Sequence, residues 1–428
     1  MTRGRVGGLR LAVRGAAVAA ASIVLAVAAV LATASVTARP VLFLAAGLLA
    51  GVGSGVAGAR WAVRHVAGPG RRSLAAAVAG AAVLAVVGVG FAVAVPSSAE
   101  GRPAPVAGER FWQLPTGTRA RYVEIPARGP RRPTPVVFVH GGPGTPDMPG
   151  DSGFFGRLAD DGFDVYVYDQ VGAGGSTRLA DPEQHGLGRD VADLEAIRIA
   201  IGAQRMVLVG HSYGARVVAG YLAAHPGRVV RAVFSSPLSL DPADSSGGGI
   251  RRRLTGPQQA ALYARLLRPR NLLVYGLLQV NPRAAHALAG DGEMDARNDQ
   301  VYAATEPGLH CAGHSAADPP TGLGFYRLQY PQSAGAPRDP DLRPTLRDDR
   351  TPALVVKGSC DYLSWASAVG YLQTLRDARL VYLPGGHNTY QDAPAAYLAA
   401  LRAFLNGGPL TPAPHTGTAP PPGYEGPP

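Results

Sequence analysis

The chain has 428 residues, of which 46% are hydrophobic and 17% charged, and its formal net charge at pH 7 is +11. This balance is too apolar for a disordered protein and too often interrupted by polar residues for one that lies wholly in lipid. Most of the excess positive charge falls in the first hundred residues, which hold nine arginines and one acid and so carry +8 of the net +11. Because these arginines flank apolar stretches, we interpret them as membrane-orientation signals and predict no nucleic-acid partner.

Three apolar runs occupy this amino-terminal part, at residues 15–38, 40–59 and 73–99. None contains a charged residue, and each reaches the roughly 20 residues that a helix needs to cross a bilayer core. We therefore predict three transmembrane helices, with the lipid bilayer as a partner, and assign residues 1–99 to a membrane anchor. The alternative is a cleaved signal peptide in the first run, followed by buried alanine-rich helices.

The arginines are distributed unevenly between the two sides of the predicted spans. Four precede the first span and four lie between the second and third, whereas only Arg39 lies between the first and second. Since cytoplasmic loops retain arginine and lysine, this predicts a cytoplasmic amino terminus and places everything after about Pro96 on the outer face of the cell membrane. Cys311 and Cys360 fall in that exported part, where a disulfide is permitted; two free buried thiols are equally compatible with the sequence.

The remaining sequence alternates strand and helix patterns. Residues 110–114 and 119–125 predict an opening antiparallel hairpin. Runs of consecutive β-branched and apolar residues then indicate parallel strands buried on both faces. Such strands are predicted at 135–140, 163–169, 205–210, 229–234, 352–357 and 379–383. With helices predicted at 190–201, from Ser212 to about Ala224 and at 393–405, the alternation implies a doubly wound parallel sheet.

The alternation stops after Ser236 and resumes at Thr351, which divides the soluble part. Residues 109–237 and 351–406 form the predicted core. Residues 238–350 are rich in helix formers and in glycine and proline turns, and we predict that they form a mainly helical cap over the carboxyl edge of the sheet. Residues 407–428 are so rich in proline that they can bury little, and we expect them to be disordered.

The segment GHSYG, residues 210–214, matches the pattern G-x-S-x-G. In that pattern small residues flank a serine on a tight turn between a strand and a helix, which exposes the hydroxyl at the top of the sheet. Here the motif follows a clear strand pattern and precedes a helix pattern. Ser212 is therefore the predicted nucleophile, while an ordinary serine at a helix start is the alternative interpretation.

A serine needs a histidine base, which in turn needs an acid to orient it. In folds that carry the serine on such a strand-to-helix turn, called the nucleophile elbow, the chain order is serine, acid, histidine. Each of the three residues lies on a loop after a strand. Asp361 follows the strand pattern of 352–357, and His387 follows that of 379–383. We predict that Asp361 and His387 complete a triad with Ser212.

Acyl transfer also needs hydrogen-bond donors aimed at the developing oxyanion. One predicted donor is the backbone N–H of Tyr213, at the positive end of the helix that begins there. The second is predicted in the glycine turn at Gly141 and Gly142, where backbone without side chains can approach a substrate oxygen closely.

Three segments carry a family resemblance: HGGPG at 140–144, DQVGAGGS at 169–176 and GHSYG at 210–214. Together they resemble the proline iminopeptidase family of α/β-hydrolases. The resemblance implies an α/β-hydrolase fold with a mainly helical cap, here preceded by three transmembrane helices. It also implies removal of amino-terminal residues from peptides, with cap carboxylates that hold the substrate's free ammonium. Glu293, Asp295 and Glu306 are the cap acids to which this role is carried over.

The leading functional hypothesis is thus a membrane-anchored serine aminopeptidase acting through an acyl-enzyme on a peptide or small acyl substrate. A carboxylesterase or lipase-like hydrolase of the same fold is the alternative, and a membrane-tethered binding module without catalysis is a third possibility. No metal or organic cofactor is predicted, because no residue cluster has ligand spacing. The oligomeric state is left open.

Overall fold

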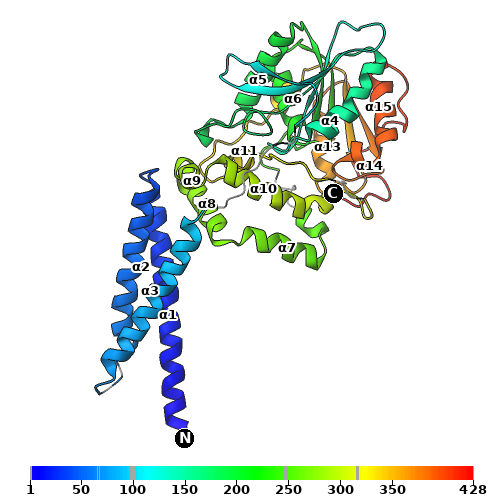
Figure 1. Cartoon of the computed structure of the whole chain (residues 1–428). Coiled ribbons are helices and arrows are strands. Elements are labelled where there is room, and N and C mark those ends of the chain that lie inside the picture. Colours follow the sequence, from blue (N-terminus) through cyan, green and yellow to red (C-terminus); the bar gives the residue numbers. More distant parts are fainter. Residues whose placement is uncertain are drawn as a thin grey trace. The chain divides into compact units, whose positions relative to one another are not determined.

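The structure of the chain is a computed structural model that describes residues 2–64, 66, 68–96, 103, 105–244, 249–314 and 318–427 (Figure 1). The described residues form two compact units. One contains the three amino-terminal helices together with Leu266–Gly290 and Ser333–Gly335. The other contains the sheet, its covering helices and the rest of the described chain.

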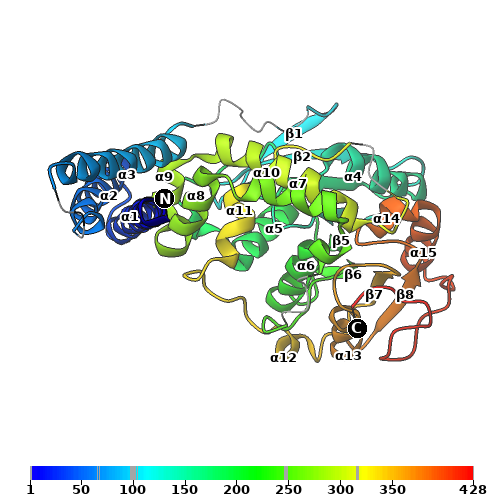
Figure 2. The ribbon, with the colours of Figure 1, turned by 90° about the horizontal axis from the view of Figure 1, so that it is seen from below.

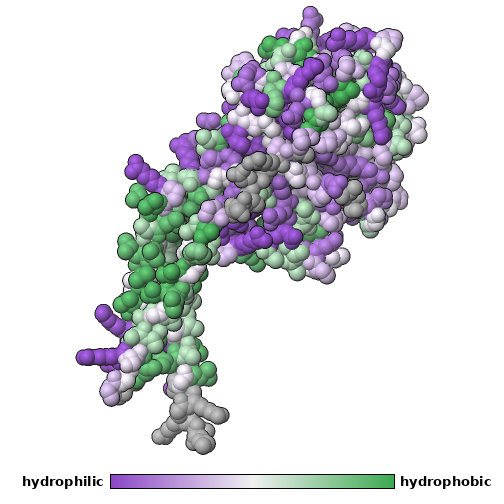
Figure 3. Space-filling view, in the orientation of Figure 1, coloured by the Kyte–Doolittle hydropathy of each residue, from purple (hydrophilic) through white to green (hydrophobic). Residues whose placement is uncertain are grey.

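The first unit is built on three long helices, α1 (Thr2–Ala34), α2 (Pro40–Ala62) and α3 (Arg71–Ala94). By length and composition all three are apolar enough to cross a membrane. Figure 3 shows hydrophobic residues over most of their visible surface. Large apolar side chains such as Leu49 and Leu84 are more than 70% exposed, an arrangement that suits contact with lipid.

The helices of this bundle approach one another closely along one face of α2. Gly47, Gly51, Gly55 and Ala59 recur at every fourth position of α2 and are all buried. A Cβ atom on Gly51 would lie 2.8 Å from Val86 Cγ1 of α3 and 3.0 Å from the Cβ of Ala26 of α1. Small residues at this spacing let helix backbones pack without intervening side chains.

The second unit contains an eight-stranded sheet with the order β1-β2-β4-β3-β5-β6-β7-β8. The β1–β2 and β2–β4 pairs are antiparallel, and every other pair is parallel. The predicted hairpin and parallel sheet are confirmed, with strand ends within two residues of the predicted ones. The strands are β1 (Glu109–Gln113), β2 (Arg119–Ile125), β3 (Val136–Val139), β4 (Val165–Tyr168), β5 (Met206–His211), β6 (Val229–Ser235), β7 (Ala353–Gly358) and β8 (Ala378–Leu383).

Helices cover both faces of this sheet, as can be followed in Figure 2. Alternate residues of β3 face opposite layers: Val137 and Val139 lie in one hydrophobic cluster, and Val136 and Phe138 in the other. This double burial explains why the central strands have continuous apolar sequences. The first cluster is completed by α5 (Leu187–Ile201), α6 (Tyr213–Ala224) and α13 (Trp365–Thr374), the second by α4 (Met148–Phe155) and α15 (Pro394–Asn406).

The insertion between β6 and β7 is mainly helical. Its helices are α7 (Gly256–Leu266), α8 (Pro269–Val280), α9 (Pro282–Leu288), α10 (Asp291–Thr305), α11 (Phe325–Gln329) and α12 (Arg343–Leu346). The sequence assigns all of it to a cap, whereas in the structure the stretch from Leu266 to Gly290 packs with the amino-terminal helices. Apart from Ser333–Gly335, which also belongs to the first unit, the other described residues of the insertion belong to the unit that contains the sheet.

The carboxyl-terminal segment 407–427 differs from our expectation of disorder. His415 pairs with Leu380 of β8, and the indole N–H of Trp365 donates to the carbonyl of Thr418 at 2.9 Å. The backbone N–H of Trp365 donates to Pro427. The segment has little apolar area to bury, but β8 is an edge strand whose free backbone groups offer hydrogen-bond partners to a passing chain.

The close packing of α2 predicts the effect of enlarging Gly51. In Gly51→Leu the side chain has no space between α1 and α3, and we expect the free energy of unfolding of the bundle to fall by about 1–3 kcal/mol. Gly53→Leu is the matched control, because no atom lies within 4 Å of a Cβ at that position of the same helix. Thermal unfolding of the full chain in detergent, followed by helical circular dichroism, compares the two. Equal melting of both variants would contradict this account of the packing.

Candidate active site

Ser212 occupies a sharp turn between β5 and α6. Its φ of 54° and ψ of −116° lie in a region that residues with side chains rarely adopt. The turn tolerates only glycine at two nearby positions. A Cβ on Gly210 would lie 2.4 Å from the carbonyl oxygen of Gly214, and one on Gly214 would lie 2.0 Å from that of Val139. The G-x-S-x-G spacing is therefore a steric requirement of this turn.

Asp361 and His387 lie beyond the carboxyl ends of β7 and β8, at the sheet edge where Ser212 follows β5. Parallel strands end at the same edge, so residues far apart in the sequence meet there. His387 Nδ1 lies 2.8 Å from Asp361 Oδ1. Ser212 and His387 line one cavity, and Asp361 is fully buried behind His387. The structure thus brings the three predicted residues together.

Lys357, the single lysine of the chain, is fully buried beside Asp361. Its Nζ lies 2.8 Å from Asp361 Oδ2 and donates a second hydrogen bond to the carbonyl of Leu363. Burial alone would raise the pKa of Asp361. The charges of Lys357 and His387 and the hydrogen bonds from both outweigh that effect and lower this pKa far below its usual value.

The ionised state of Asp361 determines the role of the imidazole. An ionised carboxylate only accepts hydrogen bonds, so the Nδ1 of His387 must carry a proton. In the neutral ring Nε2 then has the free lone pair that a general base needs. The backbone N–H of His387 donates to the carbonyl of Leu309 at 2.6 Å, which fixes the loop that carries the ring.

The glycine turn after β3 lies directly against the serine. A Cβ on Gly141 would lie 2.9 Å from the Cβ of Ser212, so a side chain is excluded there. Gly141 and Gly142 both line the cavity. Burial lowers the pKa of the adjacent His140 to about 4, so its ring is neutral, and its Nε2 accepts a hydrogen bond from the backbone N–H of Gln170. The loop that contains the predicted oxyanion donors is therefore held in place.

Tyr213 is the first residue of α6, where backbone N–H groups have no partner within the helix. Its side chain is buried in the core, and its hydroxyl donates to Asp190 Oδ2 at 2.8 Å. Asp190 also forms an ion pair with Arg327 of α11, whose guanidinium lies over the Tyr213 ring. Among the described residues that line the cavity Tyr213 is absent, so its predicted role concerns the backbone N–H alone. Sequence reasoning missed the Asp190–Arg327 pair.

The cavity has a volume of about 170 Å³ and an acidic lining. Four carboxylates lie along it, and the described lining residues include no arginine or lysine. Burial raises the pKa of both Asp147 and Asp151, most strongly that of Asp151, which also feels the charge of Asp147. Carboxyl oxygens without cationic neighbours in the lining suit a substrate group that donates hydrogen bonds, such as an ammonium. The four acids are Asp147, Asp151, Glu306 and Asp318.

Sequence reasoning found only one of these four acids. Asp147 and Asp151 follow within ten residues of the glycine turn at 141–144, and this proximity is a signal that the sequence analysis did not use. Asp318 lies in the insertion, where no sequence signal marks it.

The three cap acids named from the family resemblance have different positions. Glu306 lines the cavity, and its Oε1 lies 2.8 Å from His310 Nε2. Glu293 pairs with Arg297 one turn along α10. Asp295 accepts hydrogen bonds from Arg178 and from the backbone of Phe325, and burial raises its pKa to about 7 against the opposing charge of Arg178. Neither Glu293 nor Asp295 is among the described lining residues, so only Glu306 stands where a substrate can reach it.

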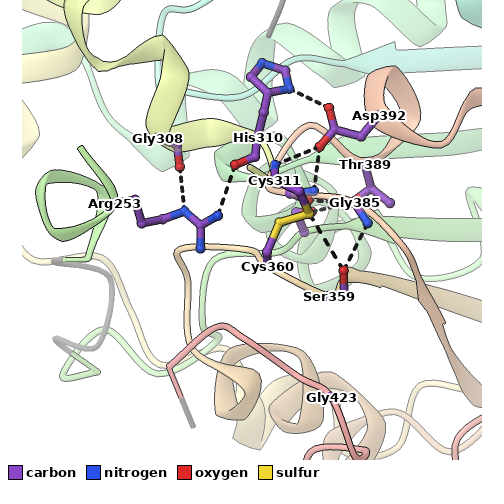
Figure 4. The surroundings of a disulfide bond; sticks show 12 residues. Arg253, Gly308, His310, Cys311, Ser359, Cys360, Gly385, Thr389, Asp392 and Gly423 are labelled. Atoms are coloured by element: carbon purple, nitrogen blue, oxygen red, sulfur yellow. Dashed lines mark hydrogen bonds and ion pairs between the residues drawn. A yellow bond between two sulfur atoms is a disulfide. The ribbon is translucent and has the colours of Figure 1, made fainter. Parts of the chain in front are cut away.

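Cys311 and Cys360 form a disulfide, the first of the two arrangements that the sequence left open (Figure 4). Cys360 directly precedes Asp361. Around Cys311, the backbone N–H and the His310 ring both contact the carboxylate of Asp392, and Arg253 donates to the carbonyl of His310. The disulfide therefore ties the insertion to the loop that carries Asp361, next to the place where Leu309 holds His387.

Comparison with known proteins agrees with this architecture. The family model described as the alpha/beta hydrolase fold matches residues 134–394. The chain belongs to the α/β-hydrolase fold family. The matched region contains the elbow, the glycine turn, the insertion and the loops of Asp361 and His387.

Within that family the chain is similar to proline iminopeptidases. It is 33% identical to a proline iminopeptidase of Neisseria gonorrhoeae over 122 residues, which are 28% of this chain and 38% of that protein. It is 36% identical to one of Heyndrickxia coagulans over 129 residues, which are 30% of this chain and 42% of that protein. The chain thus spans about two fifths of the length of these relatives. A solved proline iminopeptidase of Mycobacterium smegmatis aligns with a TM-score of 0.48 and 22% identity, over 70% of this chain and 98% of that one.

Removal of the disulfide provides a test of its positioning role. In the double variant Cys311→Ser with Cys360→Ser we expect the free energy of unfolding to fall by about 2–4 kcal/mol, because a long loop of the unfolded chain is no longer closed. Hydrolytic rate should fall as well, since the loops of Asp361 and His387 lose a common tether. Denaturant titration and ester hydrolysis measure the two effects. Dithiothreitol should reproduce both in the wild type and leave the double variant unchanged; a double variant with wild-type rate contradicts the positioning role.

Proposed function

We propose that this protein is a membrane-anchored serine hydrolase, an aminopeptidase of proline iminopeptidase type that removes amino-terminal residues from peptides. One observation carries the proposal. The imidazole of His387, oriented by the buried carboxylate of Asp361, faces the same small cavity as the hydroxyl of Ser212 on its strained turn. A serine, an imidazole and an ionised acid in this arrangement are the requirements of acyl transfer.

The proposed reaction has two stages. Ser212 Oγ attacks the acyl carbon while His387 Nε2 takes its proton, and the backbone N–H groups of Tyr213 and of Gly141 or Gly142 stabilise the oxyanion. His387 then returns the proton to the leaving amine, which departs and leaves an acyl group on Ser212. In the second stage His387 activates a water molecule, which releases the acyl group and restores the serine.

The acidic cavity lining supports a substrate with a free amine. An ammonium group next to Glu306 replaces its water shell with charge-assisted hydrogen bonds, and Asp147 and Asp151 offer further oxygen acceptors in the same cavity. The small cavity volume supports a short amino-terminal residue as the group that enters. A carboxylesterase or lipase, the alternative, has no use for four carboxylates around its acyl site.

The proposed location is the cell membrane, with the amino terminus in the cytoplasm and the catalytic domain on the outer face. The arginine distribution around α1, α2 and α3 supports this orientation. The disulfide between Cys311 and Cys360 is a second support, because such bonds persist in oxidising compartments outside the cytoplasm.

Replacement of the nucleophile is the direct test of serine catalysis. We expect Ser212→Ala to lower kcat by roughly 10⁶-fold, the loss typical of removing a hydrolase nucleophile. It should also abolish covalent labelling by a fluorophosphonate probe. Ser152→Ala is the control: its hydroxyl donates to the backbone of its own helix α4, so rate and labelling should persist. A wild-type protein that is folded but unlabelled supports a non-catalytic binding module instead.

A second variant tests recognition of the amine. Glu306→Gln removes a charge from the cavity, and we expect KM for aminoacyl arylamides to rise by roughly 10- to 100-fold, the value of a charge-assisted hydrogen bond. Turnover of simple esters without an amine should change little. Glu293→Gln removes an acid from the same helical region outside the cavity and should leave both substrates unaffected. If the wild type cleaves esters well and cleaves no free-amine substrate, the protein is an esterase.

A further inference from the structure

The segment Leu266–Gly290 of the insertion folds together with the amino-terminal helices. Figures 1 and 2 both show α8 and α9 beside the carboxyl-terminal ends of α1 and α3, and these four helices belong to the same compact unit. The contact is close, because a Cβ on Gly276 of α8 would lie 3.4 Å from the Leu31 side chain, one turn before the end of α1.

Two polar side chains of this segment satisfy carbonyl groups at helix ends. Arg270 is 3% exposed, and its guanidinium donates to the carbonyl of Val93 in the last turn of α3 and to that of Leu288. Asn281 donates to the carbonyl of Ala34, the last residue of α1, at 2.8 Å. Carbonyls at helix carboxyl ends have no partner within the helix, and near a hydrocarbon phase leaving them unpaired is costly. The segment therefore completes the ends of two candidate membrane spans.

The exposed face of α8 carries large apolar side chains where a water-facing helix would carry charges, and one of them, Leu272, borders an open apolar cavity. Leu272 is 50% exposed and Val280, two turns further along, is 41% exposed; Leu267, just before the helix, is 60% exposed. Surface helices in water place charged residues on this face. The buried face, with Leu273, Val274 and Leu277, is apolar as well, so α8 is suited to surroundings that are partly hydrocarbon.

The charges of the segment have one sign. Residues 266–290 contain Arg268, Arg270 and Arg283 and no acidic residue. Arg270 is buried against the helix ends, whereas Arg268 and Arg283 are exposed. Apolar side chains flanked by exposed arginines are typical of helices that lie in a membrane interface, where such arginines meet lipid phosphates.

The apolar cavity that Leu272 borders has a volume of about 710 Å³. It runs along α1, α2 and α3 and ends against Pro269, Leu272, Leu273 and Gly276 of α8. The volume is within the range of roughly 300–1,000 Å³ that is typical of ligand pockets. Beside membrane spans, hydrocarbon chains of lipids are the molecules with the matching chemistry and the highest local concentration.

We infer that Leu266–Gly290 is a membrane-interface segment whose exposed face, around Leu272 and Val280, contacts lipid where the acyl chains meet the headgroups. The inference rests on the proposed membrane anchoring, and it adds that part of the catalytic insertion is itself in contact with lipid. The partner is the bilayer at the carboxyl-terminal ends of α1 and α3.

The test uses the full chain in vesicles of phosphatidylcholine and phosphatidylglycerol. Because Cys311 and Cys360 are joined, an introduced cysteine is the single free thiol and can carry a nitrobenzoxadiazole label. Labels are compared at Leu272→Cys, at Leu84→Cys, exposed in the middle of α3, and at Ile199→Cys, a 62% exposed apolar position on α5 of the other unit. The quenchers are phosphatidylcholines with bromine near the headgroup or near the chain end. Fluorophosphonate labelling of each variant verifies that it is folded.

We expect the label at Leu272→Cys to lose fluorescence most strongly with the shallow bromine, and the label at Leu84→Cys with the deep bromine. The label at Ile199→Cys should keep its fluorescence with both lipids. If the Leu84→Cys label is quenched while the Leu272→Cys label behaves like that at Ile199→Cys, the interface segment is refuted and the membrane anchor stands. If the Leu84→Cys label is not quenched, the anchor fails and the inference fails with it.

Discussion

Asp361 carries a negative charge in a fully buried position, and the rest of the site depends on how that charge is balanced. Lys357 and His387 share the carboxylate, one on each oxygen, while the backbone N–H of Leu363 adds a third donor. A buried charge that loses a partner is strongly destabilising, commonly by about 3–5 kcal/mol. The arrangement is therefore over-determined: the same contacts that keep Asp361 ionised also fix the tautomer of His387. The position of the base follows from the electrostatics of its acid.

The insertion between β6 and β7 also helps to hold Asp361 and His387 in place. The disulfide joins it to the residue before Asp361, and the carbonyl of Leu309 holds the backbone of His387. Arg327 of α11 forms a buried ion pair with Asp190, and its guanidinium lies over the ring of Tyr213, the residue after Ser212. These contacts hold α11 against the turn that carries Ser212. Although the insertion is separate in sequence from the core, its contacts converge on the loops around the three triad residues. The insertion thus helps to position the loops that carry Ser212, Asp361 and His387.

Much of the sheet and of the candidate site was predictable from local pattern. Strands buried on both faces have apolar sequences that few other elements share, and chain order with strand ends was enough to select Ser212, Asp361 and His387. The partners of those residues were not predictable. In the segment PALVVK, Lys357 has the pattern of an ordinary strand residue. Nothing in the sequence indicates that its side chain is buried and paired with Asp361. Asp190 and Arg327 are 137 residues apart, and no local signal pairs them.

The lack of a local signal for tertiary partners also explains why the packing of residues 266–290 against the amino-terminal helices was not predicted. Helical spacing identifies a helix and its apolar face, but it does not identify what that face packs against. Residues 266–290 have the pattern of a cap helix, and their partner in the structure is the end of the amino-terminal bundle. The sequence does contain one weak signal of this different environment. Residues 266–290 combine three arginines and no acid with many apolar residues, which is unusual for a surface exposed to water. The composition of the whole insertion hides this feature. Charge and apolar exposure have to be compared segment by segment to distinguish residues 266–290, for which we propose contact with lipid, from the residues that line the candidate active site.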